Sequence, residues 1–480
     1  MVIQVTNQKC KLVGDIKIIE RLKKQFNIKN PNAFHIRRRG NIGDNWDGKI
    51  NYITNADFFK TGLLPQVVDF IEKVLKKKVV LEDYRKEWDI KPKKIRYVGE
   101  HTLKGDRQYQ ADAIHSVTHN KVGDINFPIG AINAATNAGK TTIMAGIHEA
   151  YRRKIPTLVL LNDGDLFEQF KREMPMLLRD EDIGFIRGKK DNHWGNITIA
   201  MVQTLTSGDN LRQFRKKIES VGILLVDEGD LADNNSYKSV INIAINAAVR
   251  VALSGSIFLS KLKKDLPKNQ NIHCIFGNEV FRITKAEMVE LGHSTPIIVN
   301  IHRGSNKPGM KGDFKGEYDS GIMYNEDRAL ECVRRLKFQA KLKRLPALVV
   351  CQFHDHIDLM YKIFQSELGH KYKIEMVHGD TKNRKDIFER YRVGKVDILI
   401  SSFIVKRGKN MPLVRYIQNA AGSDSQETIW QIMGRGERKD QSKKKVYMDD
   451  FMDEGVYLMR HSKHRIRYYK ESGMKVIMKC

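Results

Sequence analysis

Apolar runs of strand length alternate with helix-length segments from about residue 107 onward. The first set of runs is GAINAA (130–135), TLVLL (157–161), ITIAMV (197–202), GILLVD (222–227) and RVALSG (250–255). The pattern loosens over residues 284–296, and a second set follows at PALVVCQF (346–353), KIEMVHG (373–379), DILISS (397–402) and VRYIQN (414–419). Strands that are apolar throughout and alternate with helices are typical of parallel sheets covered on both faces. The pattern therefore predicts two α/β units in tandem, with one very large α/β domain as the alternative.

The first 80 residues follow a different pattern. Short β-like runs, MVIQV and KINYI, precede a helical pattern in GLLPQVVDFIEKVLKKK (62–78). Residues 82–106 are charged, contain one proline and have no apolar period, which is typical of a linker. We therefore expect a small N-terminal α+β domain over residues 1–95 and two larger domains over 96–288 and 289–480, the last ending in a basic C-terminal tail.

The charge of the chain indicates the kind of partner. The 480 residues carry a net charge of +27, and Lys and Arg are spread along the whole length. A field of that sign attracts polyanions, so nucleic acid is the expected partner and an acidic membrane the second choice. A basic protein that merely stays in solution is the alternative.

The five cysteines form no C-x-x-C pair, so neither a zinc site nor a disulfide framework is indicated, which fits a reducing cytoplasm. Neither a signal peptide nor a bilayer-spanning apolar stretch is apparent, so we expect a cytoplasmic protein.

The segment AATNAGKT (134–141) is close to the phosphate-loop pattern G-x-x-x-x-G-K-[ST], with Ala134 in place of the first glycine. Backbone N–H groups at the start of the following helix can hold phosphate. Lys140 can reach the β- and γ-phosphates, and Thr141 can offer its hydroxyl to Mg²⁺. Ala134 permits the turn if its φ is negative. A chance G-K-T is the alternative for this motif alone.

Two further segments carry candidate chemistry. LLVDEGD (224–230) ends a predicted strand with Asp227 and Glu228. One carboxylate can hold Mg²⁺, while the other polarises an attacking water; a solvated strand end is the alternative. QIMGRGER (431–438) places Arg435 and Arg438 one helical turn apart. Arginines of this kind stabilise charge during phosphoryl transfer, although a basic helix face or a nucleic-acid contact is the alternative.

Taken in order, these segments resemble the motifs of the superfamily 2 helicases and translocases. The resemblance covers residues 107 to about 450. It assigns DRQYQ (106–110) to the adenine-reading element, AATNAGKT to motif I, DEGD (227–230) to motif II, SGS (254–256) to motif III, SSFIVKRGKNMP (401–412) to motif V and QIMGRGER to motif VI. The implied fold is α/β, with two tandem RecA-like parallel-sheet domains behind the N-terminal domain.

The resemblance also implies roles for individual residues, with ATP and Mg²⁺ as cofactors. The catalytic residues would be Glu228, Asp227, Arg435, Arg438 and Gln431. The nucleotide-binding residues would be Tyr109, Gln110, Thr136, Asn137, Ala138, Gly139, Lys140, Thr141, Thr142 and Gly408. Thr141 and Asp227 would hold Mg²⁺, and the two RecA-like domains would close on ATP.

Several positions depart from the family pattern. Many relatives carry Gly or Ser where this chain has Asn137, and motif Ia usually carries a Pro-Thr pair where this chain has Asn162 and Asp163. Motif II reads DEGD rather than a DECH-like form, so Asp230 could still couple to motif III but its partner is not fixed, and motif V usually has an acidic residue where this chain has Asn410.

The N-terminal segment NWDGKINYITNADFFKTGLLPQVVDFI (45–71) resembles the N-terminal module of UvsW-type phage branch-migration helicases. This implies a phage protein, the counterpart in T5-like phages, that remodels forks and branched junctions in replication and recombination. The expected DNA contacts are Thr204, Ser402, His378, Arg37, Arg38 and Trp46, with the basic segment 460–470.

Three other functions stay open: an RNA helicase, a DNA-binding protein switched by ATP, and the motor subunit of a nuclease. His354 and His356 have no nearby cysteine and are not expected to bind a metal.

Overall fold

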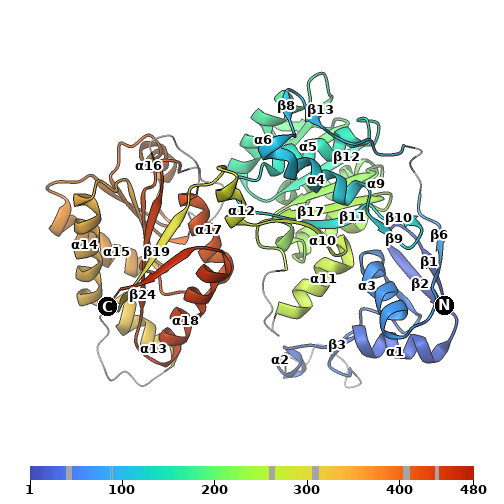
Figure 1. The fold of residues 1–480 in the computed structure, drawn as a ribbon, viewed down its shortest axis with the longest axis horizontal. Coiled ribbons are helices and arrows are strands. Elements are labelled where there is room, and N and C mark those ends of the chain that lie inside the picture. The colour runs from blue at the N-terminus through green and yellow to red at the C-terminus, as the bar shows by residue number, and fades with distance from the viewer. Residues whose placement is uncertain are drawn as a thin grey trace. The chain divides into compact units, whose positions relative to one another are not determined.

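A computed structural model describes residues 1–38, 46–86, 88, 90–258, 265–304, 313–403, 411–437 and 443–479; for Arg37, Glu427, Trp430 and Gln431 it describes the backbone alone. The chain forms two compact units, Met1–Ile283 and Thr284–Cys480. Each unit contains a large, mainly parallel β-sheet with helices on both faces (Figure 1). The expected fold class is therefore confirmed. The division into three domains at residues 95 and 288 stays a prediction.

A four-stranded sheet of order β5-β2-β1-β6 forms the N-terminal region of the first unit. Alternate side chains of β2 are buried, as expected for a sheet with one solvated face. Strand β6 pairs in parallel with β1, so the start of the predicted linker belongs to this sheet. The elements of this region are β1 (Val2–Val5), β2 (Lys9–Val13), α1 (Ile16–Phe26), β3 (Ile28–Lys29), α2 (Ala33–Arg38), β4 (Lys49–Ile50), β5 (Phe58–Lys60), η1 (Thr61–Leu63), α3 (Leu64–Asp69), η2 (Phe70–Val74) and β6 (Val80–Asp83).

The N-terminal region shares its core with the sheet that follows. Phe127, Ile129 and Cys274 lie in one apolar cluster with Leu63 and Val67. A Cβ added to Gly62 would lie 2.3 Å from the carbonyl oxygen of His273, so only glycine permits this close approach to α11 (Leu266–Phe276). The two regions are thus packed together as one body.

The large sheet of the first unit has the strand order β14-β13-β15-β12-β16-β17-β11-β18. All five strands predicted from their apolar runs are confirmed, because every residue of β11, β12, β15, β16 and β17 is buried. Its strands are β11 (Ile129–Ala134), β12 (Thr157–Leu161), β13 (Ile183–Arg187), β14 (Asp191–His193), β15 (Ile197–Met201), β16 (Ile223–Asp227), β17 (Val249–Ser254) and β18 (Glu279–Ile283). Short strands elsewhere are β7 (Tyr97–Val98), β8 (His101–Thr102), β9 (Lys121–Val122) and β10 (Ile125–Asn126).

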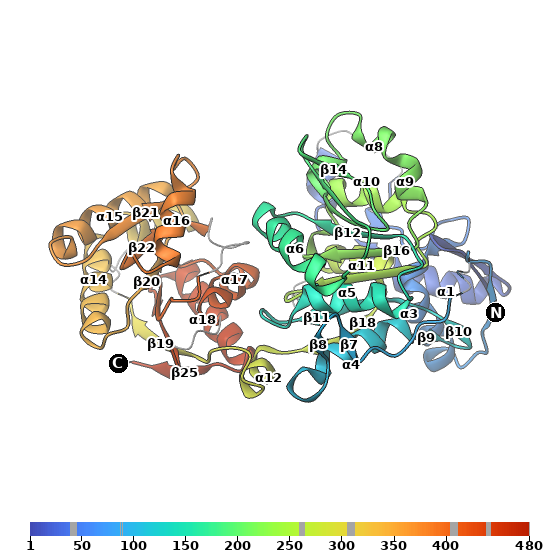
Figure 2. The same ribbon diagram turned by 90° about the horizontal axis from the view of Figure 1, so that it is seen from above.

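Helices cover both faces of this sheet (Figure 2). On one face, α4 and α5 are in such close contact that a Cβ on Gly146 would lie 2.3 Å from Ile114. On the other face, α10 and α11 contribute Tyr237, Val240 and Phe276 to the apolar core. The helices are α4 (Gln108–Thr118), α5 (Lys140–Ala150), α6 (Gly164–Leu177), α7 (Val202–Leu205), α8 (Asn210–Gln213), α9 (Arg215–Glu219), α10 (Asn235–Ile243) and α11.

The second unit contains a sheet of order β21-β22-β20-β23-β24-β19-β25. The four predicted strands are confirmed as β20 to β23, but β19, β24 and β25 were not predicted. The strands are β19 (Ile297–Arg303), β20 (Ala347–Val350), β21 (Ile374–Val377), β22 (Ile398–Ser401), β23 (Tyr416–Asn419), β24 (Val446–Met452) and β25 (Lys475–Met478).

Helices α16 to α18 cover one face of this second sheet, and α14 and α15 cover the other. The segment expected as a basic tail instead forms α18 and edge strand β25, because Tyr468, Tyr469 and Leu458 bury one side of α18. The helices are α12 (Lys285–Glu290), α13 (Phe314–Tyr318), η6 (Asp319–Met323), α14 (Glu326–Lys341), α15 (His354–Leu368), α16 (Arg384–Arg392), α17 (Gln426–Gly436) and α18 (Val456–Glu471). Among all described residues, we find no helix long and apolar enough to cross a membrane.

Candidate functional site

The loop between β11 and α5 contains two residues in the left-handed conformation. Gly139 has a φ of 73° and is the N-cap of α5, and Asn137 has a φ of 70°. Asparagine tolerates this conformation better than most non-glycine residues, which accounts for Asn137 where relatives carry Gly. Ala134 ends the buried strand β11 and is not among the residues with positive φ, as its expected role requires.

Lys140, the first residue of α5, forms an ion pair with Asp227 at the carboxyl end of β16, two strands away from β11 in the sheet. Lys140 Nζ lies 3.1 Å from Asp227 Oδ1, and the side chain of Asp227 is 2% exposed. Burial disfavours the charge on Lys140, but the carboxylates of Asp227 and Glu228 outweigh this effect and raise the pKa of Lys140. Thr141 is buried in the first turn of α5, beside half-buried Thr142. The structure therefore brings the candidate phosphate lysine and the candidate metal carboxylate together.

A tight turn follows Asp227. Glu228 has a φ of 54°, and the next residue, Gly229, packs so closely that a Cβ there would lie 2.6 Å from Cβ of Ala252. This turn directs Asp230 toward the end of β17, where its Oδ1 accepts a hydrogen bond from Ser254 Oγ at 2.7 Å. Motif II is thus joined to motif III through a buried hydrogen bond, a contact that the sequence did not specify.

Gln110 lies beneath the phosphate loop and is 1% exposed. Its Nε2 donates to the carbonyl oxygen of Ala138 at 3.0 Å, and a Cβ added to Gly139 would lie 2.3 Å from the same nitrogen. The Oε1 atom is buried and has no hydrogen-bond partner among the described residues. Tyr109 is adjacent, and burial raises the pKa of its hydroxyl. Gln110 therefore supports the loop and still has an acceptor for an incoming donor, such as the amino group of adenine.

The expected DNA contacts in the first unit are partly engaged within the protein. Asp163 is the N-cap of α6 and accepts hydrogen bonds from the backbone N–H groups of Asp165 and Leu166, each at 2.9 Å. Asp163 therefore stabilises the start of α6, whether or not it also affects DNA binding. Thr204 Oγ1 accepts from the backbone N–H of Gly188 at 3.2 Å.

Near the N-terminus, exposed Arg38 lies over the Phe34 ring, and Trp46 Nε1 donates to the carbonyl oxygen of Lys49. The side chain of Arg37 lies outside the described part of the structure.

In the second unit, the motif VI segment forms most of α17, and Ser425 is the N-cap of this helix. The end of the helix is held from two sides. Lys443 Nζ donates to the carbonyl oxygen of Gly436 at 2.9 Å, and Lys285 pairs with Glu437 at 2.9 Å, with both side chains of that pair buried. Arg435 is buried, 7% exposed. Arg438, Gly408 and the side chain of Gln431 lie outside the described residues, so their roles stay predictions.

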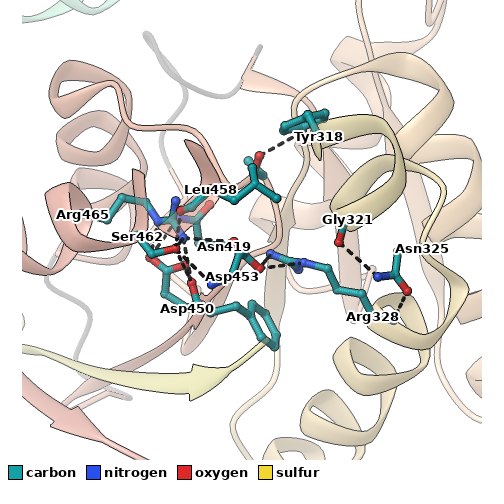
Figure 3. Close-up of polar contacts among 12 residues, drawn as sticks. Tyr318, Gly321, Asn325, Arg328, Asn419, Asp450, Asp453, Leu458, Ser462 and Arg465 are labelled. Atoms are coloured by element: carbon teal, nitrogen blue, oxygen red, sulfur yellow. Dashed lines mark hydrogen bonds and ion pairs between the residues drawn. The ribbon is translucent and has the colours of Figure 1, made fainter. Parts of the chain in front are cut away.

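A buried polar network surrounds the loop that leads into α17 (Figure 3). Arg465 contacts Asp450 at 2.9 Å and donates to the carbonyl oxygen of Ser423 at 3.3 Å. Arg328 pairs with Asp453 at 2.9 Å. Because Arg465 and both carboxylates are fully buried, Arg465 cannot contact DNA as the basic segment 460–470 was expected to do. The network instead fixes the start of the motif VI helix.

His354, His356 and His378 have different surroundings. His356 is buried on α15, and its Nδ1 has no hydrogen-bond partner among the described residues. His354 and His378 come together beside Asp380, with ligand atoms of all three residues within 4.8 Å of one another. The expectation that His354 and His356 bind no metal stays a prediction, although His354, His378 and Asp380 lie close enough together to hold an ion. Ser402 is buried at the end of β22, where its N–H donates to the carbonyl oxygen of Val377.

Comparison with known families gives two matches on the two parallel sheets. The model described as "Type III restriction enzyme, res subunit" matches residues 104–258, and "Helicase conserved C-terminal domain" matches residues 329–440. Tandem RecA-like units with a phosphate loop and an acidic strand end define a class of motor ATPases. Within that class, the chain belongs to the superfamily 2 helicases.

Individual relatives are distant. IRC3 of Saccharomyces cerevisiae, which is described as an ATP-dependent helicase, is 22% identical to this chain over 366 residues. The match covers 72% of this chain and 51% of IRC3. The chain therefore spans about half of IRC3. A protein named helicase 22, of Sulfolobus islandicus filamentous virus, is 22% identical over 77% of this chain and 68% of its own length.

Solved structures of low sequence identity align with this chain. An HsdR fragment of a type I restriction enzyme from Vibrio vulnificus YJ016 covers 74% of this chain and 65% of its own, with a TM-score of 0.52 and 18% identity. The crystal structure of UvsW from bacteriophage T4 covers 100% of this chain and 99% of its own, with a TM-score of 0.45 and 18% identity.

Proposed function

We propose that this protein is an ATP-driven DNA helicase or translocase that remodels branched DNA. The observation that carries the proposal is the constellation at the carboxyl ends of β11, β16 and β17. There, the left-handed phosphate loop, the Lys140–Asp227 pair and the adjoining Glu228 lie on one edge of the sheet. Ligands of open α/β sheets bind at this edge.

The residues present fit Mg²⁺ and ATP. Bound Mg²⁺ would neutralise charge that develops on the phosphates. Asp227 and Thr141 provide the hard oxygen ligands that Mg²⁺ prefers. Lys140 would exchange part of its contact with Asp227 for the β- and γ-phosphates, and Glu228 would hold the attacking water as a general base. Arg435, Arg438 and Gln431 are proposed to stabilise the transferred phosphoryl group.

The Asp230–Ser254 hydrogen bond supports coupling between hydrolysis and the rest of the motor. Both groups are buried, so a displacement of Asp227 and Glu228 on hydrolysis would be transmitted to the end of β17. In many enzymes the rate of turnover depends on movements of loops or domains that contact the active site.

The net charge of +27 supports binding to nucleic acid. Thr204, Ser402 and His378 are proposed phosphate contacts. Contacts of that kind carry no sequence information. Binding should therefore depend strongly on salt and little on base sequence. The N-terminal resemblance to branch-migration helicases is the reason for proposing branched DNA over RNA.

The test measures ATP hydrolysis with forked DNA, linear duplex, single-stranded DNA and RNA, together with unwinding of a labelled fork. We expect forked DNA to give the highest rate and Glu228→Gln to lower turnover at least 100-fold while ATP still binds, since general-base catalysis contributes about 10²- to 10⁴-fold. Glu219→Gln, on the surface helix α9, is the matched control and should leave the rate unchanged. Hydrolysis by Glu228→Gln at the normal rate would refute the site assignment.

The same assay separates the alternative functions. RNA that stimulates turnover more than forked DNA would indicate an RNA helicase on the same motor. ATP binding without measurable turnover would indicate a DNA-binding protein switched by ATP. Either result would overturn the proposed activity while leaving the family unchanged.

A further inference from the structure

A cavity of about 470 Å³ lies between the N-terminal region and the amino ends of the large sheet in the first unit. Figure 1 shows the N-terminal elements beside α11, which provides part of the wall. Its volume is within the range of small-molecule sites. Apolar parts of the wall come from Phe58 and Ile50 of the N-terminal region and from Ile241 and Ile275 of α10 and α11.

Arg250 of β17 lines this cavity and is 6% exposed. Its Nε and Nη2 atoms are buried and have no hydrogen-bond partner among the described residues. Burial lowers the pKa of Arg250 to about 10. A buried guanidinium without a carboxylate is costly, so an anion bound at Arg250 would remove a large part of that cost.

The remaining charges of the cavity have the same sign. Lys9, Lys60 and Lys238 lie in its wall, and none of its lining residues is acidic. Lys60 is exposed at the end of β5, and partial desolvation followed by the charge on Arg250 lowers its pKa. Lys238 has its own partner, Asp233. The uncompensated positive charge is therefore centred on Arg250 and Lys60.

One flat apolar surface is also present. The Phe58 ring is part of the cavity wall, and two cations border it: Lys9 Nζ lies 4.6 Å and Lys11 Nζ 5.6 Å from the ring centre. The cavity thus combines an anion-binding end with an aromatic side.

We propose that this cavity binds an organic phosphate of mononucleotide size. The terminal phosphate would contact Arg250 and Lys60, and the flat apolar part would lie against Phe58. The phosphate could belong to a free nucleotide or to the 5′ end of a DNA strand. The site is separate from the phosphate loop, because Arg250 and Ser254 lie four residues apart at opposite ends of β17, about 13 Å at 3.3 Å per residue.

The test uses the full chain carrying Lys140→Ala, which removes the proposed motor nucleotide site. Titration calorimetry would measure binding of inorganic phosphate, AMP, a 5′-phosphorylated dinucleotide and the same dinucleotide without phosphate. We expect AMP to bind at one site and the unphosphorylated dinucleotide not to bind. Comparing the two phosphorylated compounds distinguishes a free nucleotide from a strand end. ATP binding by the parent and by Lys140→Ala tests the motor site separately, so the two proposals can fail independently.

Arg250→Gln should weaken AMP binding at least tenfold, and Lys60→Met several-fold. The matched control, Lys104→Met, replaces an exposed lysine of the same unit that does not line the cavity. Without ligand, Arg250→Gln should keep or raise the Tm, because it removes an unpaired buried charge, but it should lose the Tm increase that AMP gives. Absence of any phosphate binding, or AMP affinity that neither variant alters, would overturn the proposal. So would a lower Tm of ligand-free Arg250→Gln, because it would show that the guanidinium is already satisfied.

Discussion

Replacing Gln110 with Ala separates two contributions to nucleotide binding. Its Nε2 donates to the carbonyl oxygen of Ala138, while its buried Oε1 has no partner among the described residues. We expect the first atom to stabilise the phosphate loop for any nucleotide and the second to accept a hydrogen bond from the amino group of adenine. Guanine presents a carbonyl oxygen at that position and cannot make the second contact.

The magnitude follows from the number of hydrogen bonds lost. One net hydrogen bond contributes about 1 kcal/mol, and leaving the carbonyl oxygen of Ala138 unsatisfied costs about 1–3 kcal/mol. Affinity for GTP should therefore fall about 5- to 150-fold through the loop alone. Affinity for ATP should fall by a further factor of about five, which lowers the preference for ATP over GTP by the same factor.

The assay is equilibrium titration of the full chain with ATP and GTP analogues that cannot be hydrolysed. Gln108→Ala, at an exposed position of the same helix, is the control and should change neither affinity. If Gln110→Ala leaves the affinity for GTP intact, Gln110 does not support the loop. If the preference for ATP is unchanged, Oε1 does not contact the base.

Three more predictions concern the buried polar groups. Arg328→Met should destabilise the second unit by about 3 kcal/mol in urea denaturation because buried Asp453 loses its 2.9 Å partner and keeps only Arg465 at 3.4 Å. The Arg328→Met/Asp453→Asn double variant should recover most of this, and equal loss in both would refute the pairing argument. Burial lowers the pKa of His356 to about 3. The unfolded chain therefore binds a proton at this histidine below about pH 6.5, whereas the folded chain does not, so the free energy of unfolding falls as the pH drops from 6.5 toward 3. At pH 5 this amounts to about 2 kcal/mol, which His356→Leu should abolish in denaturation at pH 7 and pH 5; the same acid loss in both proteins would contradict it. Ser254→Ala should lower DNA-stimulated ATP turnover more than unstimulated turnover, and equal rates in variant and parent would exclude a coupling role for its hydrogen bond with Asp230.

The strands that could be predicted are those without a polar interruption. Strand β16 consists of apolar residues followed by an acid, so the sequence predicts where the strand ends. Its acid could then be expected to lie near the phosphate loop. Strand β24 has the sequence VYMDDFM, and two adjacent acids normally indicate a surface. In the fold, Tyr416 and Asn300 contact Asp449, and Arg465 contacts Asp450, so both carboxylates are buried with partners. Those partners are distant in sequence, and the pattern of a single strand cannot reveal them.

The candidate site shows the same limit. The pairing of Lys140 with Asp227 follows from two motifs whose strand ends share one edge of the sheet. The pairing of Asp230 with Ser254 depends on the left-handed turn at Glu228, which no local preference predicts. The approach of His354 to His378 likewise depends on how α15 begins next to β21.

The close approach of Gly62 to the backbone of α11 has a consequence for how this protein can be divided. Phe127 and Ile129 of the motor region and Cys274 of α11 are covered by N-terminal residues. A motor cut free at residue 95 would expose this apolar surface and would be prone to aggregate. The first eighty residues are therefore not a cassette that can be exchanged between motors, and a transplanted version would need the matching α11 surface as well.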